Sequence, residues 1–482
     1  MRPYNQTLLC DFYELTMGNG YLLSGKKDMQ ACFDLYFRKV PDNGGYAIAA
    51  GLSEMIEFLE QLHFDKEDID YLRSKNQFSE EFLQYLADFK FECDVYAVEE
   101  GTPVFPNEPL VTVKGSAIQA QLLETMLLLT INHQSLIATK ANRIVRAAQG
   151  RPVFEFGSRR AQGSNAAILG ARAAFVGGCA GTACACCEQL YGIPAVGTMA
   201  HSWIQMYDTE LEAFEAYARY YPDNCILLVD TYNVVKSGIP NAIKAYENVL
   251  KPLGKRLKGI RIDSGDITYL TKKVRKMLDE AGLEDCTIFI SNSLDEYIIR
   301  DILLQGAQIN SFGVGERLIT SKSEPVFGGV YKLVATEKDG EYVPKIKLSE
   351  NVEKITTPGY KKIYRLFSNE TGNMVADLIA LHDEEFDFTK PITLFDPVYT
   401  WKKKTFENYR VEEILKPIYL NGKLVYKTPS VIESKKYCAE QVGKLWDEVK
   451  RFENPQTYYV DLSQKLWDVK HSLLSEGAGE KK

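Results

Sequence analysis

One stretch decides the fold: Ile193-Pro194-Ala195-Val196, followed by Gly197-Thr198-Met199-Ala200-His201-Ser202-Trp203. The apolar run has the length and composition of a buried strand in a parallel sheet, and the Gly-Thr pair ends the strand and turns the chain outward. His201 would then lie at the carboxyl end of the strand, where open α/β sheets and α/β barrels bind their ligands. We therefore take His201 as a candidate functional residue. A histidine that is hydrogen-bonded beneath a loop is the alternative.

Short apolar runs alternate with helical patterns over the middle of the chain. The helical patterns lie at Gly163–Ala174, Leu211–Tyr220, Asn241–Leu250 and Leu270–Ala281. The apolar runs, in addition to Ala195–Val196, are Val153–Phe156, Ala173–Val176, Cys225–Val229, Gly259–Ile262, Thr287–Ile290 and Ile309–Phe312. Strands that alternate with helices form a parallel sheet. Seven such units without a dinucleotide-binding glycine fingerprint favour an α/β barrel over an open sheet.

The two ends of the chain have a different pattern from the middle. Near the start, strand-like runs at Cys32–Arg38, Cys93–Val98 and Leu110–Val113 stand among helical patterns, which predicts a separate layer of helices and strands. After about residue 340 there are charged turns, a hairpin-like Leu420–Leu424 and a Lys/Glu-rich helical region. We predict three domains: an N-terminal α/β domain (1–130), a barrel (131–340) and a C-terminal region (341–482).

Size and composition limit the class of protein. The 482 residues suffice for two or three domains, and 45% hydrophobic with 25% charged residues is typical of a soluble globular protein. A formal charge of −8 argues against a protein that binds nucleic acid or a membrane surface. The polar start, Met1–Asp11, lacks the apolar core of a signal peptide, and ten scattered cysteines fit a reducing compartment. We therefore expect a cytoplasmic protein.

Arginine and aspartate side chains follow two of the predicted strands. Arg159 and Arg160 come directly after Phe156-Gly157-Ser158, where they can clamp a carboxylate or a diphosphate. A surface pair is the alternative for these two arginines. Alternation places Arg261 and Asp263 on the same side of their strand, so that together they can bind an anion and a ribose hydroxyl or hydrated Mg²⁺. A structural ion pair is the alternative for this second pair.

Two turns of the kind that bind phosphate follow the last two strands. Ser291-Asn292-Ser293-Leu294-Asp295-Glu296 predicts a helix N-terminus capped by Ser293, with Glu296 at the capping-box position. Gly313-Val314-Gly315 is a Gly-x-Gly turn at the place where such barrels bind phosphate through backbone N–H groups. A histidine, arginines, aspartates and two phosphate turns at one rim describe a site for a polyanionic sugar phosphate.

A long helical stretch, Gln119–Gln149, carries three basic residues at spacings of three. Lys140, Arg143 and Arg146 therefore share about one face of the helix. We expect this face to be solvated, with an anion-lining face as the alternative.

Taken in order, these motifs resemble the nicotinate phosphoribosyltransferase family. The resemblance implies an α/β fold: an N-terminal α/β layer, an irregular, TIM-like α/β barrel of the type II phosphoribosyltransferase kind and a C-terminal extension. It covers most of the chain, and the segments that carry it are Tyr13-Glu14-Leu15-Thr16-Met17 with Tyr21, Gly44-Gly45-Tyr46, Phe156–Gly163, Tyr191-Gly192-Ile193-Pro194 through His201-Ser202, Arg261–Asp266, Ser291–Glu296, Gly313–Gly315 and Gly329-Val330-Tyr331-Lys332-Leu333-Val334.

The resemblance implies the first step of NAD salvage from nicotinate. Nicotinate, 5-phosphoribosyl 1-diphosphate, ATP and water would give nicotinate mononucleotide, diphosphate, ADP and phosphate. His201 would be the catalytic residue that ATP phosphorylates, with Asp263 and Arg261 as further catalytic residues. Mg²⁺ is implied as the cofactor, near Asp263 and the diphosphate, with no site made by side chains alone. Family members are dimers, which implies a homodimer with the sites at its interface.

The resemblance also implies which residues bind nicotinate. Arg261 and Thr198 would contact nicotinate, and Phe156 would stack on its ring together with Tyr21 of the partner subunit. Arg159 would meet nicotinate or diphosphate.

Five positions in the two turns are implied to bind the 5′-phosphate. Asn292, Ser293, Gly313 and Gly315 would cradle it. Many relatives have Thr at position 316, and a carboxylate there would repel phosphate. We therefore expect Glu316 to contribute only its backbone N–H, with its side chain pointing away or pairing with Arg317.

Other activities are open at this point. Nicotinamide phosphoribosyltransferase, the nearest alternative, has a carboxylate near the ring, whereas the matching stretch Phe175–Gly181 contains no acid, which favours a carboxylate substrate. Quinolinate phosphoribosyltransferase has a shorter chain and needs more basic residues. From other classes, a sugar-phosphate lyase or isomerase barrel would use His201 as general base, and a binding protein would take the ligand without turnover.

Overall fold

The computed structural model describes residues 5–351 and 354–477, and the chain divides into two compact units. The first, here named the sheet unit, comprises Met1–Leu136, Val326–Pro429 and Lys436–Lys482. The second, the barrel unit, comprises Ile137–Pro325 and Ser430–Lys435. The segments before and after the barrel thus fold into one unit. The predicted three-domain division at 130 and 340 stays a prediction.

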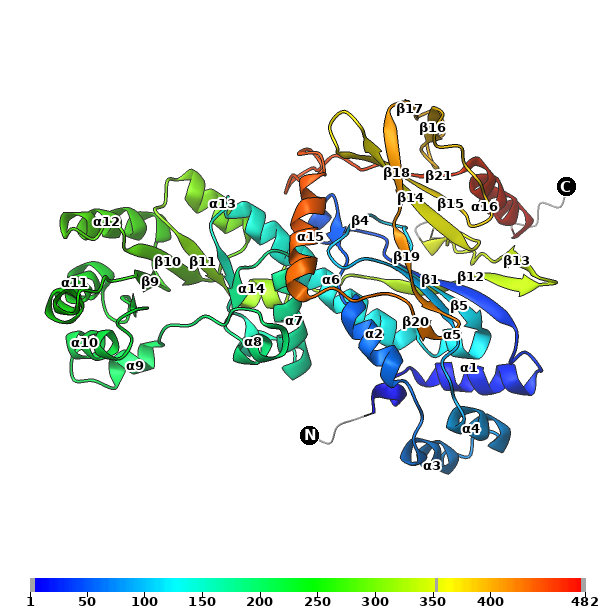
Figure 1. Cartoon of the computed structure of the whole chain (residues 1–482), viewed down its shortest axis with the longest axis horizontal. Coiled ribbons are helices and arrows are strands. Elements are labelled where there is room, and N and C mark those ends of the chain that lie inside the picture. Colours follow the sequence, from blue (N-terminus) through cyan, green and yellow to red (C-terminus); the bar gives the residue numbers. More distant parts are fainter. Residues whose placement is uncertain (1–4, 352–353, 478–482) are drawn as a thin grey trace. The chain divides into compact units, whose positions relative to one another are not determined.

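A seven-stranded antiparallel sheet, in the order β13-β12-β1-β5-β3-β19-β20, forms the centre of the sheet unit (Figure 1). Its interior strand β1 is buried from Ala31 to Tyr36, so both faces of this strand are covered. The predicted hairpin at Leu420–Leu424 is confirmed, because Leu420 pairs with Lys423. The strands are β1 Gln30–Tyr36, β3 Asp94–Val98, β5 Val111–Ser116, β12 Val330–Lys338, β13 Glu341–Pro344, β19 Leu415–Leu420 and β20 Lys423–Leu424.

Helices from the N-terminal segment form an apolar cluster beside this sheet. Leu15 and Leu22 of α1 pack there with Leu72 of α3. Gly18 lets α1 approach α4 closely, because a Cβ at this position would lie 3.1 Å from the ring of Phe82. The helices are α1 Phe12–Leu23, α2 Leu52–Gln61, α3 Lys66–Ser74, α4 Glu80–Ala87, α5 Ala117–Gln121 and α6 Glu124–Ala147.

A buried ion pair joins the N-terminal and C-terminal segments of the sheet unit. Arg365 and Asp377 lie on neighbouring strands and are at most 1% exposed, with 2.6 Å between Nη2 and Oδ2. Arg365 Nη1 also donates to the carbonyl of Pro103 (2.9 Å), and the Tyr458 hydroxyl donates to Asp377 (3.0 Å). The elements around this pair are β2 Ala47–Ile48, β4 Pro103–Val104, β14 Lys361–Ser368, β15 Met374–Leu381, β16 Ile392–Phe395, β17 Lys403–Phe406, β18 Tyr409–Glu413, β21 Val460–Leu462, α15 Val431–Gly443 and α16 Gln464–Gly477.

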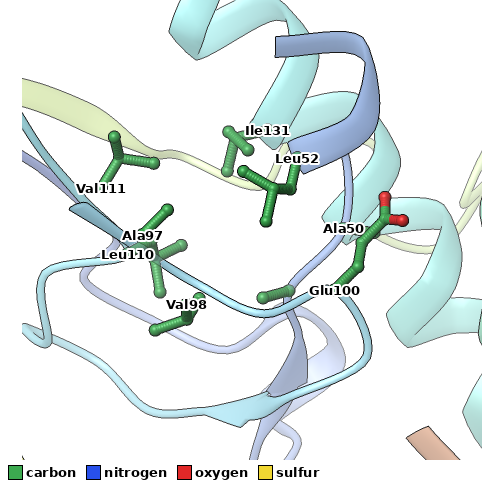
Figure 2. A pocket seen from close by; sticks show the side chains of 9 residues that line it. Ala50, Leu52, Ala97, Val98, Glu100, Leu110, Val111 and Ile131 are labelled. Atoms are coloured by element: carbon green, nitrogen blue, oxygen red, sulfur yellow. The ribbon is translucent and has the colours of Figure 1, made fainter. Parts of the chain in front are cut away.

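The sheet unit contains a small internal cavity of about 10 Å³. Figure 2 shows the aliphatic side chains of Leu52, Val111 and Ile131 around it, with Glu100 at its edge. Glu100 accepts a hydrogen bond from the backbone N–H of Gly51 (2.8 Å). A cavity of this size holds about one water molecule, so it is a packing defect and not a substrate site.

The barrel unit contains a parallel sheet in the order β7-β6-β11-β10-β9-β8. The first strand in sequence, β6, pairs with the last, β11, and β7 pairs in parallel with Ala195 through one bridge. Each strand therefore lies beside its neighbour in sequence around the sheet, as in a barrel, with an opening between Ala195 and β8 within the described residues. The strands are β6 Val153–Glu155, β7 Gly181–Thr182, β8 Ile226–Leu228, β9 Gly259–Ile262, β10 Thr287–Asn292 and β11 Ser311–Val314.

Helices connect these parallel strands, as the alternating pattern predicted. Figure 1 shows α11 and α12 beside β9 and β10. One predicted strand is wrong: Ala173–Val176 is the buried end of α7, and the strand lies later, at β7. A four-residue apolar run cannot distinguish a buried helix end from a strand. The helices are α7 Ser164–Val176, α8 Ala185–Tyr191, α9 His201–Gln205, α10 Glu210–Tyr220, α11 Ile239–Ala245, α12 Ile267–Glu280, α13 Glu296–Leu304 and α14 Glu316–Ile319.

Replacement of Asp377 by Ala tests the buried ion pair. The change removes the carboxylate that is hydrogen-bonded to the buried Arg365 guanidinium and leaves only Glu108, 3.9 Å from Nη2, so we expect the free energy of unfolding to fall by about 3–5 kcal/mol. Chemical denaturation measures this value. As a matched control, Asp383→Asn breaks an ion pair with Lys465 whose side chains are half exposed, and should change the same free energy by at most ~1 kcal/mol. Equal effects of the two substitutions would contradict this account.

Candidate active site

His201 lies at the start of a short helix that follows the predicted strand. The prediction of a buried strand at Ile193–Val196 is only partly right, because only Ile193 is buried and pairing is limited to the bridge at Ala195. Thr182 donates its N–H to the Pro194 carbonyl (3.0 Å), and Val196 donates to the Thr182 carbonyl (2.8 Å). This pairing with β7 carries the chain to the rim, where His201 begins α9.

The imidazole of His201 is held on one side and open on the other. Nδ1 lies 3.1 Å from the hydroxyl of Thr231. Nε2 lies 3.9 Å from a carboxylate oxygen of Asp230 and 4.0 Å from one of Asp263, and the side chain is 41% exposed. These two distances are too long for hydrogen bonds. The ring can therefore accept a group at Nε2 beside two negative charges.

Asp230 is a site residue that the motif analysis missed. Its side chain is 1% exposed. One oxygen, Oδ2, accepts from the backbone N–H of Asp263 (2.9 Å) and from the hydroxyl of Ser264 (2.6 Å). The other oxygen, Oδ1, is buried without a hydrogen-bond partner among the described residues. A buried carboxylate oxygen in this state favours a cation beside it. Asp230 comes directly after the predicted strand Cys225–Val229. The rule that selects polar residues at the carboxyl ends of predicted strands would therefore have found it.

Arg261 connects several parts of the site through its guanidinium. Nε donates to the hydroxyl of Ser291 (2.6 Å) and Nη1 to the carbonyl of Met199 (3.1 Å). Nη1 also lies 3.4 Å from the Thr198 hydroxyl, and Nη2 lies 3.3 Å from Asp263. The predicted placement of Arg261 and Asp263 on one side is confirmed, and they form an ion pair. The structure thus brings together His201, Thr198, Arg261 and Asp263.

Phe156 adds an aromatic surface beside Arg261. Its backbone N–H donates to the Val314 carbonyl (2.8 Å), and its ring packs against Phe289 at 5.5 Å between centroids. The Arg261 guanidinium carbon lies 5.9 Å from the centre of this ring. Gly313 is buried, and a Cβ there would lie 2.8 Å from the Phe156 ring and 2.9 Å from that of Phe289. The two rings can therefore pack in this way only because Gly313 has no side chain.

A buried carboxylate supports the turn after Phe156. Glu155 accepts from the hydroxyl of Thr182 (2.7 Å) and from the backbone N–H of Gly157. Its burial raises the pKa of the carboxyl, while these hydrogen bonds lower it. Arg159 is exposed in the short 3₁₀ helix Ser158–Arg160 that follows.

The turn after β10 differs from its prediction. Asp295, and not Ser293, caps α13, and Glu296 is fully buried instead of closing a capping box. A Ser-x-x-Glu pattern predicts a cap only when the helix begins one residue after the Ser. Asn292 and Ser293 are exposed, and Ser293 donates its N–H to the side chain of Asn292 (2.6 Å).

The turn after β11 agrees with its prediction in part. The side chain of Glu316 pairs with Lys322 (2.6 Å) and lies 3.8 Å from Arg160, which lowers the pKa of Glu316. Pairing with Arg317, one of the two expected arrangements, is wrong, because Arg317 binds Asp295 instead. Gly315 is half-buried just before Glu316.

Tyr21 belongs to α1 of the sheet unit, where it packs against the apolar cluster of Leu15 and Leu22. Its predicted contact with the nicotinate ring is not tested and stays a prediction.

Comparison with known proteins places the chain in a family. The N-terminal domain model of nicotinate phosphoribosyltransferase (NAPRTase) matches residues 8–132, the NAPRTase family model matches 152–385, and the C-terminal domain model matches 360–470. Nicotinate phosphoribosyltransferase of Bacillus subtilis is 42% identical over 472 residues, which are 98% of this chain and 95% of that protein. A relative of the same activity name from Mycobacterium tuberculosis is 38% identical over 97% of this chain and 93% of its own length.

A solved structure supports the same assignment. The crystal structure of human nicotinic acid phosphoribosyltransferase has a TM-score of 0.84 and 29% identity, covering 97% of this chain and all of that one. The fold and the site define an enzyme with a type II phosphoribosyltransferase barrel. The chain belongs to the nicotinate phosphoribosyltransferase family. The family, the fold class and the transfer of a phosphoribosyl group to nicotinate, as predicted from the motifs, are thereby confirmed. No helix within residues 5–351 and 354–477 has the length and apolar character needed to cross a membrane.

Replacement of Asp230 by Asn tests its part in the site. Asn keeps an oxygen for the Asp263 N–H and Ser264 hydroxyl but removes the charge beside His201. We expect ATP-stimulated kcat/KM to fall about ten- to hundredfold with an unchanged unfolding temperature.

The matched control is Asp266→Asn, an exposed residue three positions after Asp263 that caps α12. Asn also caps helices well, so this variant should keep full activity. Full activity of Asp230→Asn would show that the Asp230 charge is not used.

Proposed function

We propose that the chain couples the transfer reaction to ATP through phosphorylation of His201. The observation that supports this is the open Nε2 of His201 between Asp230 and Asp263. An imidazole nitrogen attacks the γ-phosphorus of ATP, an N–P bond forms as the bond to the ADP oxygen breaks, and ADP leaves. Water later takes the phosphoryl group, which releases phosphate and returns a proton to the ring. The hydrogen bond of Nδ1 to Thr231 orients the ring during both steps.

Nicotinate binds, in this proposal, through its carboxylate to Arg261 with help from the Thr198 hydroxyl. An arginine that is 16% exposed and already oriented by Ser291 loses little entropy when it binds a carboxylate. The ring lies on Phe156, whose position is fixed by Phe289. The stretch Phe175–Gly181, without an acid, ends at β7, which pairs with β6 just before Phe156. This supports the acid over the amide as substrate.

The phosphoribosyl diphosphate lies along the same rim. Asn292, Ser293, Gly315 and the backbone N–H of Glu316 hold the 5′-phosphate, together with the turn at Gly313. Arg159 meets the diphosphate or nicotinate, and Asp263 holds a ribose hydroxyl. As the C1–diphosphate bond loosens toward an oxocarbenium-like state, the arginines stabilise the charge of the leaving group while the pyridine nitrogen attacks.

The carboxylates of Asp230 and Asp263 fit Mg²⁺. Oδ1 of Asp230 is buried without a hydrogen bond, and carboxylate oxygens are the ligands that Mg²⁺ prefers. Asp230 and Asp263 would hold the ion, which would supply charge neutralisation for the diphosphate.

The chain acts as a cytoplasmic homodimer in this proposal. Helix α1, which carries Tyr21, exposes the large apolar side chains of Phe12, Tyr13 and Met17. Such a surface fits an interface through which Tyr21 of the partner subunit stacks on nicotinate. All ten cysteines are free thiols, which fits a reducing compartment.

The change His201→Ala tests the phosphohistidine. We expect the variant to lose the label from γ-³²P-ATP and all stimulation by ATP, while it keeps slow ATP-independent turnover. Product formation from nicotinate, phosphoribosyl diphosphate and Mg²⁺, with and without ATP, measures this. Full ATP stimulation in the variant would refute the role of His201, and the lyase or isomerase alternative requires no label even in the wild type.

The change Arg261→Ala tests the carboxylate contact. Loss of a charge-assisted hydrogen bond should raise the KM for nicotinate about ten- to hundredfold. Nicotinamide and quinolinate in parallel assays show whether the acid is selected over the amide and the diacid. Arg219→Ala, an exposed arginine paired with Glu215 on α10, is the control and should leave KM unchanged. An unchanged KM for nicotinate in Arg261→Ala would place the carboxylate elsewhere.

A further inference from the structure

An ion pair links the two turns that follow β10 and β11. The strands run in parallel with Ser291 opposite Gly313 and Asn292 opposite Val314, and this backbone ladder ends there. Beyond the ladder, Arg317 Nη1 contacts Oδ2 of Asp295. We propose that Arg317 and Asp295 are positioning residues that hold the two turns at the spacing that the 5′-phosphate of phosphoribosyl diphosphate requires. This inference rests on the proposed phosphate site.

Asp295 uses its two carboxylate oxygens for different purposes. Oδ1 caps α13 by accepting from the backbone N–H groups of Tyr297 (3.1 Å) and Ile298 (2.9 Å). Oδ2 receives the guanidinium of Arg317. The carboxylate is 14% exposed and the arginine 35%, so the pair is partly shielded from solvent. Because Asn also caps helices, Asp295→Asn can remove the ion pair and retain the cap.

The residue after Asp295 fixes the start of α13 from the other side. Glu296 is fully buried, with Lys140 Nζ and Arg143 Nε each 2.8 Å from its oxygens. The expectation that Lys140 and Arg143 form a solvated face is therefore wrong, because both are buried against Glu296. Lys140 and Arg143 of α6 therefore anchor the start of α13 through their contacts with Glu296. The turn before α13 thus has a rigid support.

The second turn has no side-chain cap. It leads into α14, a single turn of four residues in which Leu318 and Ile319 are buried, and the preceding residue Gly315 has no side chain to cap it. Arg317 lies in this helix, so its contact with Asp295 ties the uncapped turn to the anchored one. Loss of the contact should let the Gly315 turn move relative to Asn292. Neither Arg317 nor Asp295 needs to touch the substrate for this effect.

The experiment compares Arg317→Gln, Asp295→Asn and the double variant. We expect each single change to raise the KM for phosphoribosyl diphosphate about tenfold, because a small misplacement of a binding group costs up to ~100-fold. The KM for nicotinate and the unfolding temperature should stay unchanged, and kcat should stay within about twofold. The double variant should be no worse than either single variant, because the partners act as one unit. Arg317→Lys should recover part of the affinity.

Two control variants distinguish failure of the positioning role from failure of the proposed phosphate site. Arg256→Gln removes another ion pair of the barrel unit, with Asp285, and should leave every kinetic constant unchanged. Asn292→Asp places a negative charge at the proposed phosphate site and should weaken phosphoribosyl diphosphate binding by repulsion. An effect of Asn292→Asp without an effect of Arg317→Gln would overturn the positioning role alone. No effect of Asn292→Asp would overturn the phosphate site itself. Additive losses in the double variant would also overturn the positioning role.

Discussion

The pairing of β11 with β6 is the constraint on which the site depends. It joins the last parallel strand to the first, so that strand ends separated by most of the barrel sequence become neighbours. The backbone N–H of Phe156 donates to the Val314 carbonyl where these strands pair. Gly313, which has no side chain, leaves room for the Phe156 ring. Without it, the aromatic surface and the Gly-x-Gly turn would lie at opposite edges of an open sheet. The hydrogen bonds of Glu155 to Thr182 and Gly157 then add β7 to the same edge.

Contacts between charged and polar groups determine how the side chains are arranged at that edge of the parallel sheet. Arg261 contacts the segment before His201, Ser291 near the end of β10 and Asp263 after β9. The guanidinium therefore cross-links three segments of the barrel unit. Asp230 is the counterpart, a buried carboxylate with one hydrogen-bonded oxygen and one oxygen that has no hydrogen-bond partner among the described residues. A buried oxygen in this state favours a positive charge beside it.

Patterns along the sequence predicted the parts of the site that depend on strand ends. Arg261, Asp263 and Phe156 lie at or just after the ends of apolar runs, and the rule that parallel strands end at one edge placed them together. The same rule would have identified Asp230. The buried pairing of Lys140 and Arg143 with Glu296 was not predictable, because charged residues at helical spacing are usually solvated and the partner lies far along the chain. The helix cap at Asp295 was missed because four possible caps stand within five residues. The end of α7 was taken for a strand because small apolar residues fit both structures.

The sheet unit contains segments from both ends of the chain, and this affects how the protein folds during its synthesis. During translation, the whole barrel segment leaves the ribosome before β19, which pairs with β3. Most of the barrel unit, Ile137–Pro325, can therefore fold before the sheet unit is complete. Until β19 arrives, β3 is an uncovered sheet edge. A chain that ends before β19 keeps this edge open, and an open sheet edge favours aggregation even when the barrel has folded.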